Sequence, residues 1–149
     1  MTRLLLLVLI PFGVAACDGF PTGTSDSLSG SFELAAVGGA PLPAVMWSDA
    51  AATGVLHADR LDFRPDGTVT RHYRFVMTPH GSEEVEVFAH VLELEYRRRG
   101  RSIEIGRLEP CPPNALCIPN DIGRIRSGGL ELESSLWGAG RKGLLYLRQ

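Results

Sequence analysis

Residues 55–78 read VLHADRLDFRPDGTVTRHYRFVMT, and this stretch decides the fold. In its first half Leu61 and Phe63 alternate with charged residues, as in a strand that buries one face. Pro65-Asp66-Gly67 in the middle is a strong turn signal. The apolar positions of one face in the second half are Val69, Tyr73, Phe75 and Met77. The stretch therefore predicts an antiparallel β-hairpin.

The same alternation continues outward from this hairpin in both directions. Short strands bounded by Gly- and Pro-containing turns are expected over residues 32–36, 85–96, 102–108, 122–126, 130–134 and 144–148. Sequential antiparallel strands of this number close into an up-and-down barrel, which removes exposed sheet edges. The predicted fold class is therefore all-β, with roughly eight antiparallel strands in an up-and-down barrel and almost no helix.

Two segments break the simple pattern. Val85 and Val87 mark one face of their strand, whereas Leu92, Leu94 and Tyr96 mark the other. A strand cannot change faces without an extra residue, so a bulge or a break is expected between Val87 and Leu92. Residues 45–53 fit either a helical turn capped by Ser48 or a loop that acts as a lid.

The N-terminus has the layout of a secretory signal: Arg3, an apolar run over 4–10, and small residues before Cys17. The run is shorter than the 20 or so residues that a spanning helix needs. Val14-Ala15-Ala16-Cys17 resembles the bacterial lipobox, in which the cysteine is lipidated and becomes the first residue of the mature protein. The expected organisation is a signal peptide at 1–16, lipidated Cys17 with a flexible linker at 17–30, and a barrel domain at 31–149.

This organisation predicts a protein held by lipid in the cell envelope, facing the periplasm or the exterior. Asp18 resembles the inner-membrane retention signal of some Gram-negative bacteria, but the choice between the inner and the outer membrane stays open. Cys111 and Cys117 remain after Cys17 is assigned, and in an exported protein such a pair predicts a disulfide. The Pro-rich loop that holds them favours a tight turn and offers no histidine for a zinc site.

The charge pattern excludes a nucleic-acid footprint, because the formal net charge of the 149 residues is −2 and the signs are mixed. One basic cluster surrounds Gly100 and consists of Arg97, Arg98, Arg99 and Arg101. We expect a solvated hairpin tip there. The alternative is contact with anionic lipid or lipopolysaccharide.

Motifs of known catalytic chemistry are missing from the sequence, which contains no nucleophile elbow, metal-binding helix or phosphate-binding loop. None of the four histidines (His57, His72, His80 and His90) has metal-site spacing with another ligand. His57 and Asp59 would share a face of a strand, where the carboxylate either orients an imidazole for acid–base work or makes an ordinary contact at the barrel rim. The sequence therefore predicts a protein that is not an enzyme, with no metal and no cofactor.

Aromatic residues are the best candidates for a ligand site. An eight-stranded barrel is either filled by its own side chains or holds one small ligand. The candidate lining residues are Trp47, Phe63, Tyr73, Phe75, Leu94, Tyr96 and Trp137. Trp47 and Trp137 lie in or beside loops, where they would close opposite ends of the barrel or cover one mouth. The first hypothesis is a binding module for a small apolar ligand or an envelope component. The alternative is a solid-core structural protein that acts on an envelope partner through its surface, and the oligomeric state stays open in both.

One family resemblance supports this fold. Gly30-Ser-Phe32-Glu-Leu34 and the stretch from Val37 to Pro43 are similar to the opening of small lipocalin-like lipoproteins secreted by bacteria, and the match continues through residues 61–68. Residues 144–148 resemble the closing strand of that family. The matching residues are turn and core signals, so the resemblance implies a lipocalin-like barrel and supplies no substrate.

Overall fold

A computed structural model describes residues 27–113, 117–136 and 140–149, and its regular elements are all strands. Their bounds are β1 Gly30–Val37, β2 Ala40–Pro41, β3 Ala44–Ser48, β4 Ala52–Phe63, β5 Thr68–Pro79, β6 Glu86–Arg99, β7 Ser102–Gly106, β8 Asp121–Arg126, β9 Gly129–Ser134 and β10 Lys142–Arg148. The described residues contain no helix long and apolar enough to cross a membrane.

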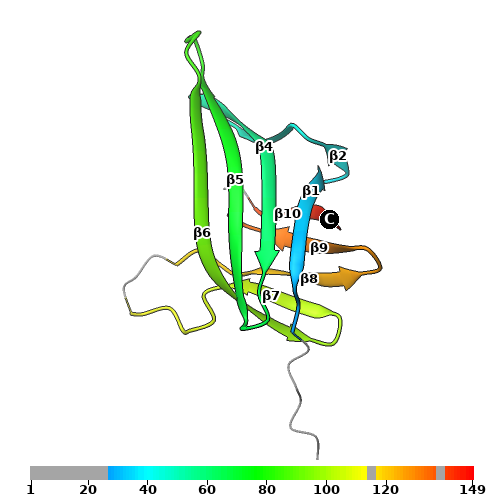
Figure 1. Ribbon diagram of the computed structural model, residues 1–149. Coiled ribbons are helices and arrows are strands. Elements are labelled where there is room, and N and C mark those ends of the chain that lie inside the picture. Colours follow the sequence, from blue (N-terminus) through cyan, green and yellow to red (C-terminus); the bar gives the residue numbers. More distant parts are fainter. Residues whose placement is uncertain (1–26, 114–116, 137–139) are drawn as a thin grey trace, which may run out of the picture.

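Eight of these strands form a closed antiparallel up-and-down barrel (Figure 1). Each of the strands from β4 to β9 pairs with the next one in sequence, and β1 pairs with both β10 and β4, which closes the ring. The short strands β2 and β3 are additions that pair with β1 and β4. The predicted fold class is therefore confirmed.

The hairpin expected at the centre of residues 55–78 is formed by β4 and β5. Phe63 is paired with Val69 across the turn. The Asp66 carboxylate accepts hydrogen bonds from the Thr68 backbone N–H at 2.9 Å and from its hydroxyl at 2.6 Å, and these bonds lower the pKa of Asp66. Gly67 has φ +91°, which favours glycine and explains the Asp-Gly pair.

One end of the barrel is closed by packed aromatic rings. Phe32, Phe63 and Tyr96 meet edge to face, with ring centroids 5.5 Å and 5.1 Å apart. Leu28 packs into the same core, and its backbone N–H donates to the Tyr96 hydroxyl at 2.8 Å. The Tyr96 hydroxyl also lies 2.9 Å from the Arg64 carbonyl oxygen. The chain therefore enters the barrel over a sealed end.

The prediction of a bulge or a break in β6 is wrong. The β5–β6 register runs without a shift from Thr68 opposite Glu95 to Met77 opposite Glu86. The change of parity has another cause: Val85 and Val87 lie on the outer face, 54% and 53% exposed. This strand carries apolar residues on both of its faces, so the apparent change of face needs no extra residue.

Residues 45–53 form neither a helical turn nor a lid loop. Ala44–Ser48 is strand β3, and a tight turn leads from it into β4. The Asp49 carboxylate accepts the backbone N–H groups of Ala51 at 2.8 Å and Ala52 at 3.0 Å, which lowers the pKa of Asp49. The cap of this turn is therefore Asp49 and not Ser48.

The strands of the barrel differ greatly in length. β4, β5 and β6 rise beyond the short strands β7, β8 and β9 (Figure 1). β6 pairs with β7 only over Glu95–Arg99. The upper parts of β4, β5 and β6, with β3 beside β4, form an open sheet whose inner face lies at the mouth of the barrel.

Candidate functional site

A buried ionic cluster crosses the barrel below this mouth. Arg71 on β5 is 1% exposed, and its Nε donates to both Asp59 carboxylate oxygens at 3.1 and 2.9 Å. Its Nη1 donates to Asp121 Oδ2 at 2.8 Å, and its Nη2 to the Tyr146 hydroxyl at 3.1 Å. The Tyr146 hydroxyl donates to Asp59 Oδ2 at 2.8 Å. Side chains from β4, β5, β8 and β10 thus meet around one guanidinium.

The electrostatics of the cluster follow from its burial. Burial raises the pKa of Asp121, an effect that outweighs the opposing influence of Arg71 and of the Ser134 hydrogen bond. Burial also holds the pKa of Tyr146 well above its ordinary value, so this hydroxyl stays protonated. Burial opposes the charge of Arg71, but Tyr146, Asp59 and Asp121 outweigh it and raise the pKa of Arg71. We interpret the cluster as a structural one, because its partners occupy the guanidinium and its members are buried.

Above the cluster, ring side chains line the inner side of the open sheet. We call this set the aromatic face, and it consists of Trp47, Tyr73, Phe75, Phe88 and His90. The ring centroids of Trp47 and Phe75 are 6.4 Å apart, those of Phe75 and Phe88 are 6.5 Å apart, and those of Phe88 and His90 are 6.1 Å apart. Tyr73 and His90 are 5.3 Å apart. His90 is exposed and the other four rings are partly buried, so the aromatic face meets solvent.

Gly54 explains how two of these rings approach the sheet closely. A Cβ atom at this buried glycine would clash with the Phe75 ring and would stand 2.6 Å from the Trp47 indole. Both rings therefore use the space left by the missing side chain. Glycine in a strand commonly marks such a close approach.

An open hollow of about 600 Å³ borders the aromatic face. Tyr73 and His90 contribute to its lining, together with Leu34 and Leu42. The rest of the lining is mostly polar and consists of Glu33, His57, Ala58, Asp59, Arg60, His72, Arg74, Ala89 and Val91.

The residues predicted to line a ligand site are divided between two levels of the barrel. Trp47, Tyr73 and Phe75 come together on the aromatic face, and Leu94 is partly buried against the core. Phe63 and Tyr96 pack into the sealed end, at 4% and 7% exposure. Trp137 lies outside the described residues.

The sequence analysis did not predict two parts of the site: the pair Phe88 and His90, and the buried Arg71. Phe88 and His90 have the same parity as Leu92 and Leu94, but the expected bulge obscured it. Arg71 has the parity of Val69 and Tyr73, so alternation alone would have placed it inside the barrel. Its charge favours solvent in a sequence reading; its partner Asp59 lies on the other strand of the same hairpin, whereas Asp121 is 50 residues away.

The expectation that His57 and Asp59 share a face is wrong. A register shift between Leu56 and Ala58 separates the two side chains. His57 is exposed, whereas Asp59 is 3% exposed and is bound to Arg71. The carboxylate therefore does not orient this imidazole.

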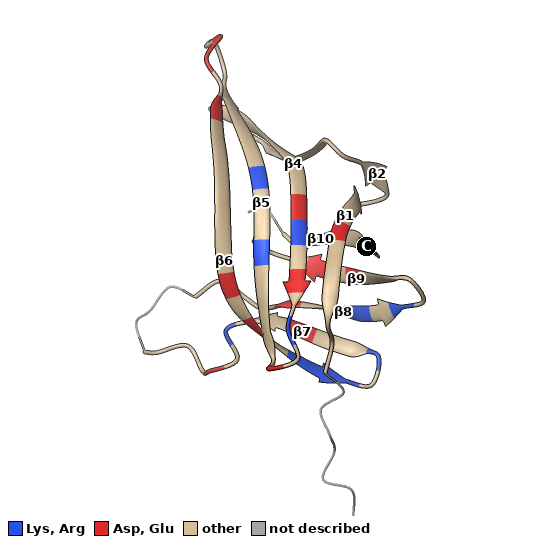
Figure 2. Ribbon diagram, in the orientation of Figure 1, with Lys and Arg blue, Asp and Glu red and all other residues tan. Residues whose placement is uncertain are grey.

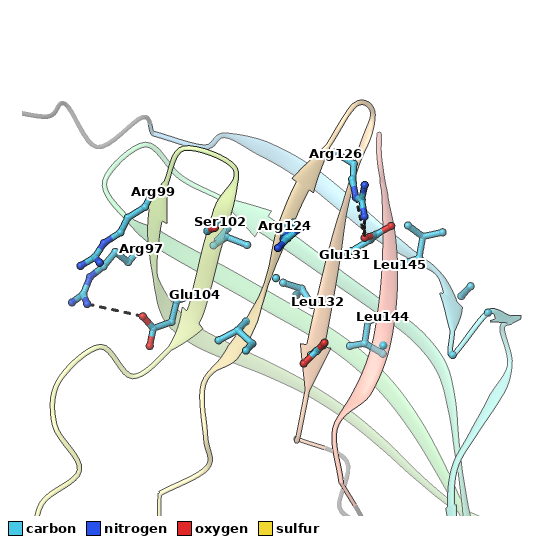
Figure 3. Close-up of a pocket in the computed structure, with 18 residues that line it drawn as sticks. Arg97, Arg99, Ser102, Glu104, Arg124, Arg126, Glu131, Leu132, Leu144 and Leu145 are labelled. Atoms are coloured by element: carbon cyan, nitrogen blue, oxygen red, sulfur yellow. Dashed lines mark hydrogen bonds and ion pairs between the residues drawn. The ribbon is translucent and has the colours of Figure 1, made fainter.

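A second hollow is an open groove of about 910 Å³ on the outer face of the barrel (Figure 3). Arg97, Arg99, Arg124 and Arg126 line it together with Glu104, Glu131 and Glu133. Arg126 pairs with Glu131 at 2.6 Å, and Arg97 with Glu104 at 4.0 Å. Alternating charges on neighbouring strands stabilise such a sheet face. We therefore interpret this groove as a solvated charge ladder.

Cys111 and Cys117 form the expected disulfide, with the sulfur atoms 2.04 Å apart. Within residues 27–113, 117–136 and 140–149, no group of three or more His, Cys, Asp or Glu side chains is placed to hold a metal ion. No family model, curated protein or solved structure matches the chain.

Proposed function

We propose that this protein is a lipid-anchored binding module of the cell envelope, and that the aromatic face holds a small apolar ligand with a flat portion. The observation that carries the proposal is the row formed by Trp47, Tyr73, Phe75, Phe88 and His90. Its rings remain partly open to solvent at the barrel mouth. Ligand sites are concave, mostly apolar, and fixed by a few polar groups. Tyr73 and His90 would supply such polar groups here.

The buried Arg71 cluster limits how deep the ligand reaches. An apolar group placed beside these charges would displace their hydrogen-bond partners, which costs free energy. The ligand therefore rests above the cluster. Phe63 and Tyr96, which lie in the sealed end, are left out of the proposed contact set.

The location in the envelope is proposed from the sequence and the disulfide. Cys17 follows a lipobox-like stretch, and a disulfide between Cys111 and Cys117 is typical of an oxidising compartment. Both features suit the lipocalin-like lipoproteins that the turn and core motifs resemble.

A dye-binding experiment tests the aromatic face. We expect anilinonaphthalene sulfonate to bind the folded chain and to quench Trp47 by energy transfer. Phe88→Ser removes one ring of the row and should weaken dye binding about fivefold, since an aromatic contact contributes about 1 kcal/mol. The matched control is Val87→Ser, the adjacent residue on the outer face. Equal loss in both variants, or no loss in either, would overturn the proposed site.

The alternative function is a protein that acts through its surface, and one observation favours it: one edge of β6 is, over part of its length, not paired with any strand that the structure describes.

A further inference from the structure

The upper part of β6 has an edge to which no described strand is paired. β6 pairs with β5 over Glu86–Glu95, and with β7 only over Glu95–Arg99. On the β7 side, residues 86–94 have no backbone partner in the described part of the chain. We call residues 86–94 the free β6 edge, and Figure 1 shows it rising beyond β7.

The backbone groups that face outward along this edge are identifiable. The Tyr96 N–H donates to the Gly67 carbonyl, on the β5 side, at 2.8 Å. Since successive residues point their N–H and C=O groups to opposite sides, the outward groups belong to the odd-numbered residues Val87, Ala89, Val91 and Glu93. A strand with such unpaired groups is a template for pairing with another chain.

The side chains along the edge lack the usual protection against pairing. Six consecutive residues, 87–92, carry no Asp, Glu, Lys, Arg or Pro, and this stretch is the uncharged length of β6 in Figure 2. Val87 and Val91 on the outer face are 53% and 60% exposed. Natural edge strands are normally interrupted by Lys, Pro or a bulge. This one is regular throughout, as its unshifted register with β5 shows.

We propose that the free β6 edge pairs antiparallel with the same edge of a second copy of this chain, which forms a dimer with a continuous sheet. The edge is self-complementary. In a register centred on Ala89, Val87 faces Val91 of the second copy and Glu86 faces Leu92. A register one residue further along, centred on His90, places Glu86 opposite Leu94. In both registers the outward N–H and C=O groups of one copy face those of the other copy. Neither register places Glu86 of one copy opposite Glu93 of the other.

Sedimentation equilibrium of the full chain in a density-matched detergent tests the dimer. The wild type should show a concentration-dependent monomer–dimer equilibrium. Val91→Lys places a charge on the edge and should weaken association at least about tenfold. The matched control is Val45→Lys, because Val45 has the same outer-face position on β3 and is 58% exposed. That variant should associate like the wild type.

A second variant separates pairing from side-chain effects. Ala89→Pro removes an N–H that points to the free edge and leaves the ladder with β5 intact, so it should abolish the dimer with little change in melting temperature. If Ala89→Pro does not fold, the sedimentation comparison of Val91→Lys with Val45→Lys tests the dimer alone. A wild type that stays monomeric, a dimer that resists Val91→Lys, or a dimer that Val45→Lys disrupts equally would overturn the proposal.

Discussion

Arg71 is the largest fully buried side chain in the described part of the molecule. Its three hydrogen-bonding nitrogens satisfy two carboxylates and one hydroxyl from three other strands. Burying a charge is costly unless it is paired, and removing one partner leaves the others uncompensated. At the residue scale, Arg71 therefore determines whether the interior tolerates Asp59 and Asp121.

Replacing Arg71 by methionine tests this role. Arg71→Met should lower the free energy of unfolding by about 3–5 kcal/mol, because two carboxylates stay buried without a cation. Guanidinium chloride titration measures the loss. The control is Arg74→Met, exposed on the same strand, which should change stability by no more than about 0.5 kcal/mol. Similar values for the two variants would show that the cluster is not stabilising.

The raised pKa of Asp121 predicts a pH dependence with a definite sign. The folded protein holds this proton more tightly than the unfolded chain, in which the pKa of Asp121 has its ordinary value of 3.8. The contribution of Asp121 to stability is therefore fully present below pH 3.8 and falls as the pH rises through the folded pKa.

Comparison with Asp121→Asn isolates this contribution. The stability of the wild type minus that of the variant should be largest in acid and should decrease as the pH is raised to about 7. Denaturant titrations of both proteins across this range measure it. A difference that grows with pH would show that the native environment favours the charged form of Asp121.

At the scale of elements, Gly54 lets the Phe75 and Trp47 rings pack directly against the backbone of β4. Gly54→Ala should destabilise the protein by about 1–3 kcal/mol, because the new methyl group displaces the Phe75 and Trp47 rings. Tryptophan emission should shift with the stability. Gly143→Ala is the control, since Gly143 is exposed and nothing lies within 4 Å of its Cβ position. If the control variant shifts the emission equally, the two rings are not packed over Gly54.

Strand parity explains which elements were predictable. The hairpin of β4 and β5 followed from a run of alternating residues and one Pro-Asp-Gly turn, both of which are local signals. The β4 bulge next to His57 was not predictable, because it depends on how β4 pairs with β5. The apolar outer face of β6 imitated a change of register, since alternation cannot tell a buried valine from an exposed one. The aromatic face was therefore only partly foreseen.

At the scale of the whole molecule, the barrel is closed by pairings between distant segments. β1 pairs with β10 and with β4, and this closure seals the end around Tyr96. The number and order of the strands were enough to predict the barrel. The ionic cluster was not predictable as a whole, because Asp121 on β8 and Tyr146 on β10 reach the Asp59–Arg71 pair of the β4–β5 hairpin only when the ring closes.

The disulfide makes a smaller contribution to the whole. Cys111 and Cys117 are six residues apart in a segment between β7 and β8, outside the paired strands. Replacing both by serine should lower stability by about 2 kcal/mol, the loop-closure value for so short a loop. The far-ultraviolet circular dichroism of the barrel should be unchanged. Loss of the β spectrum would instead show that the fold depends on this bond.

The central claim is that the barrel mouth holds a ligand on the aromatic face. Native mass spectrometry of the mature chain, after exposure to an envelope lipid extract, tests it most directly. We predict a stoichiometric adduct of defined mass, lost in Phe88→Ser and retained in Val87→Ser. A bare protein mass in every extract, or an adduct that Phe88→Ser binds as well as the wild type, would contradict the account.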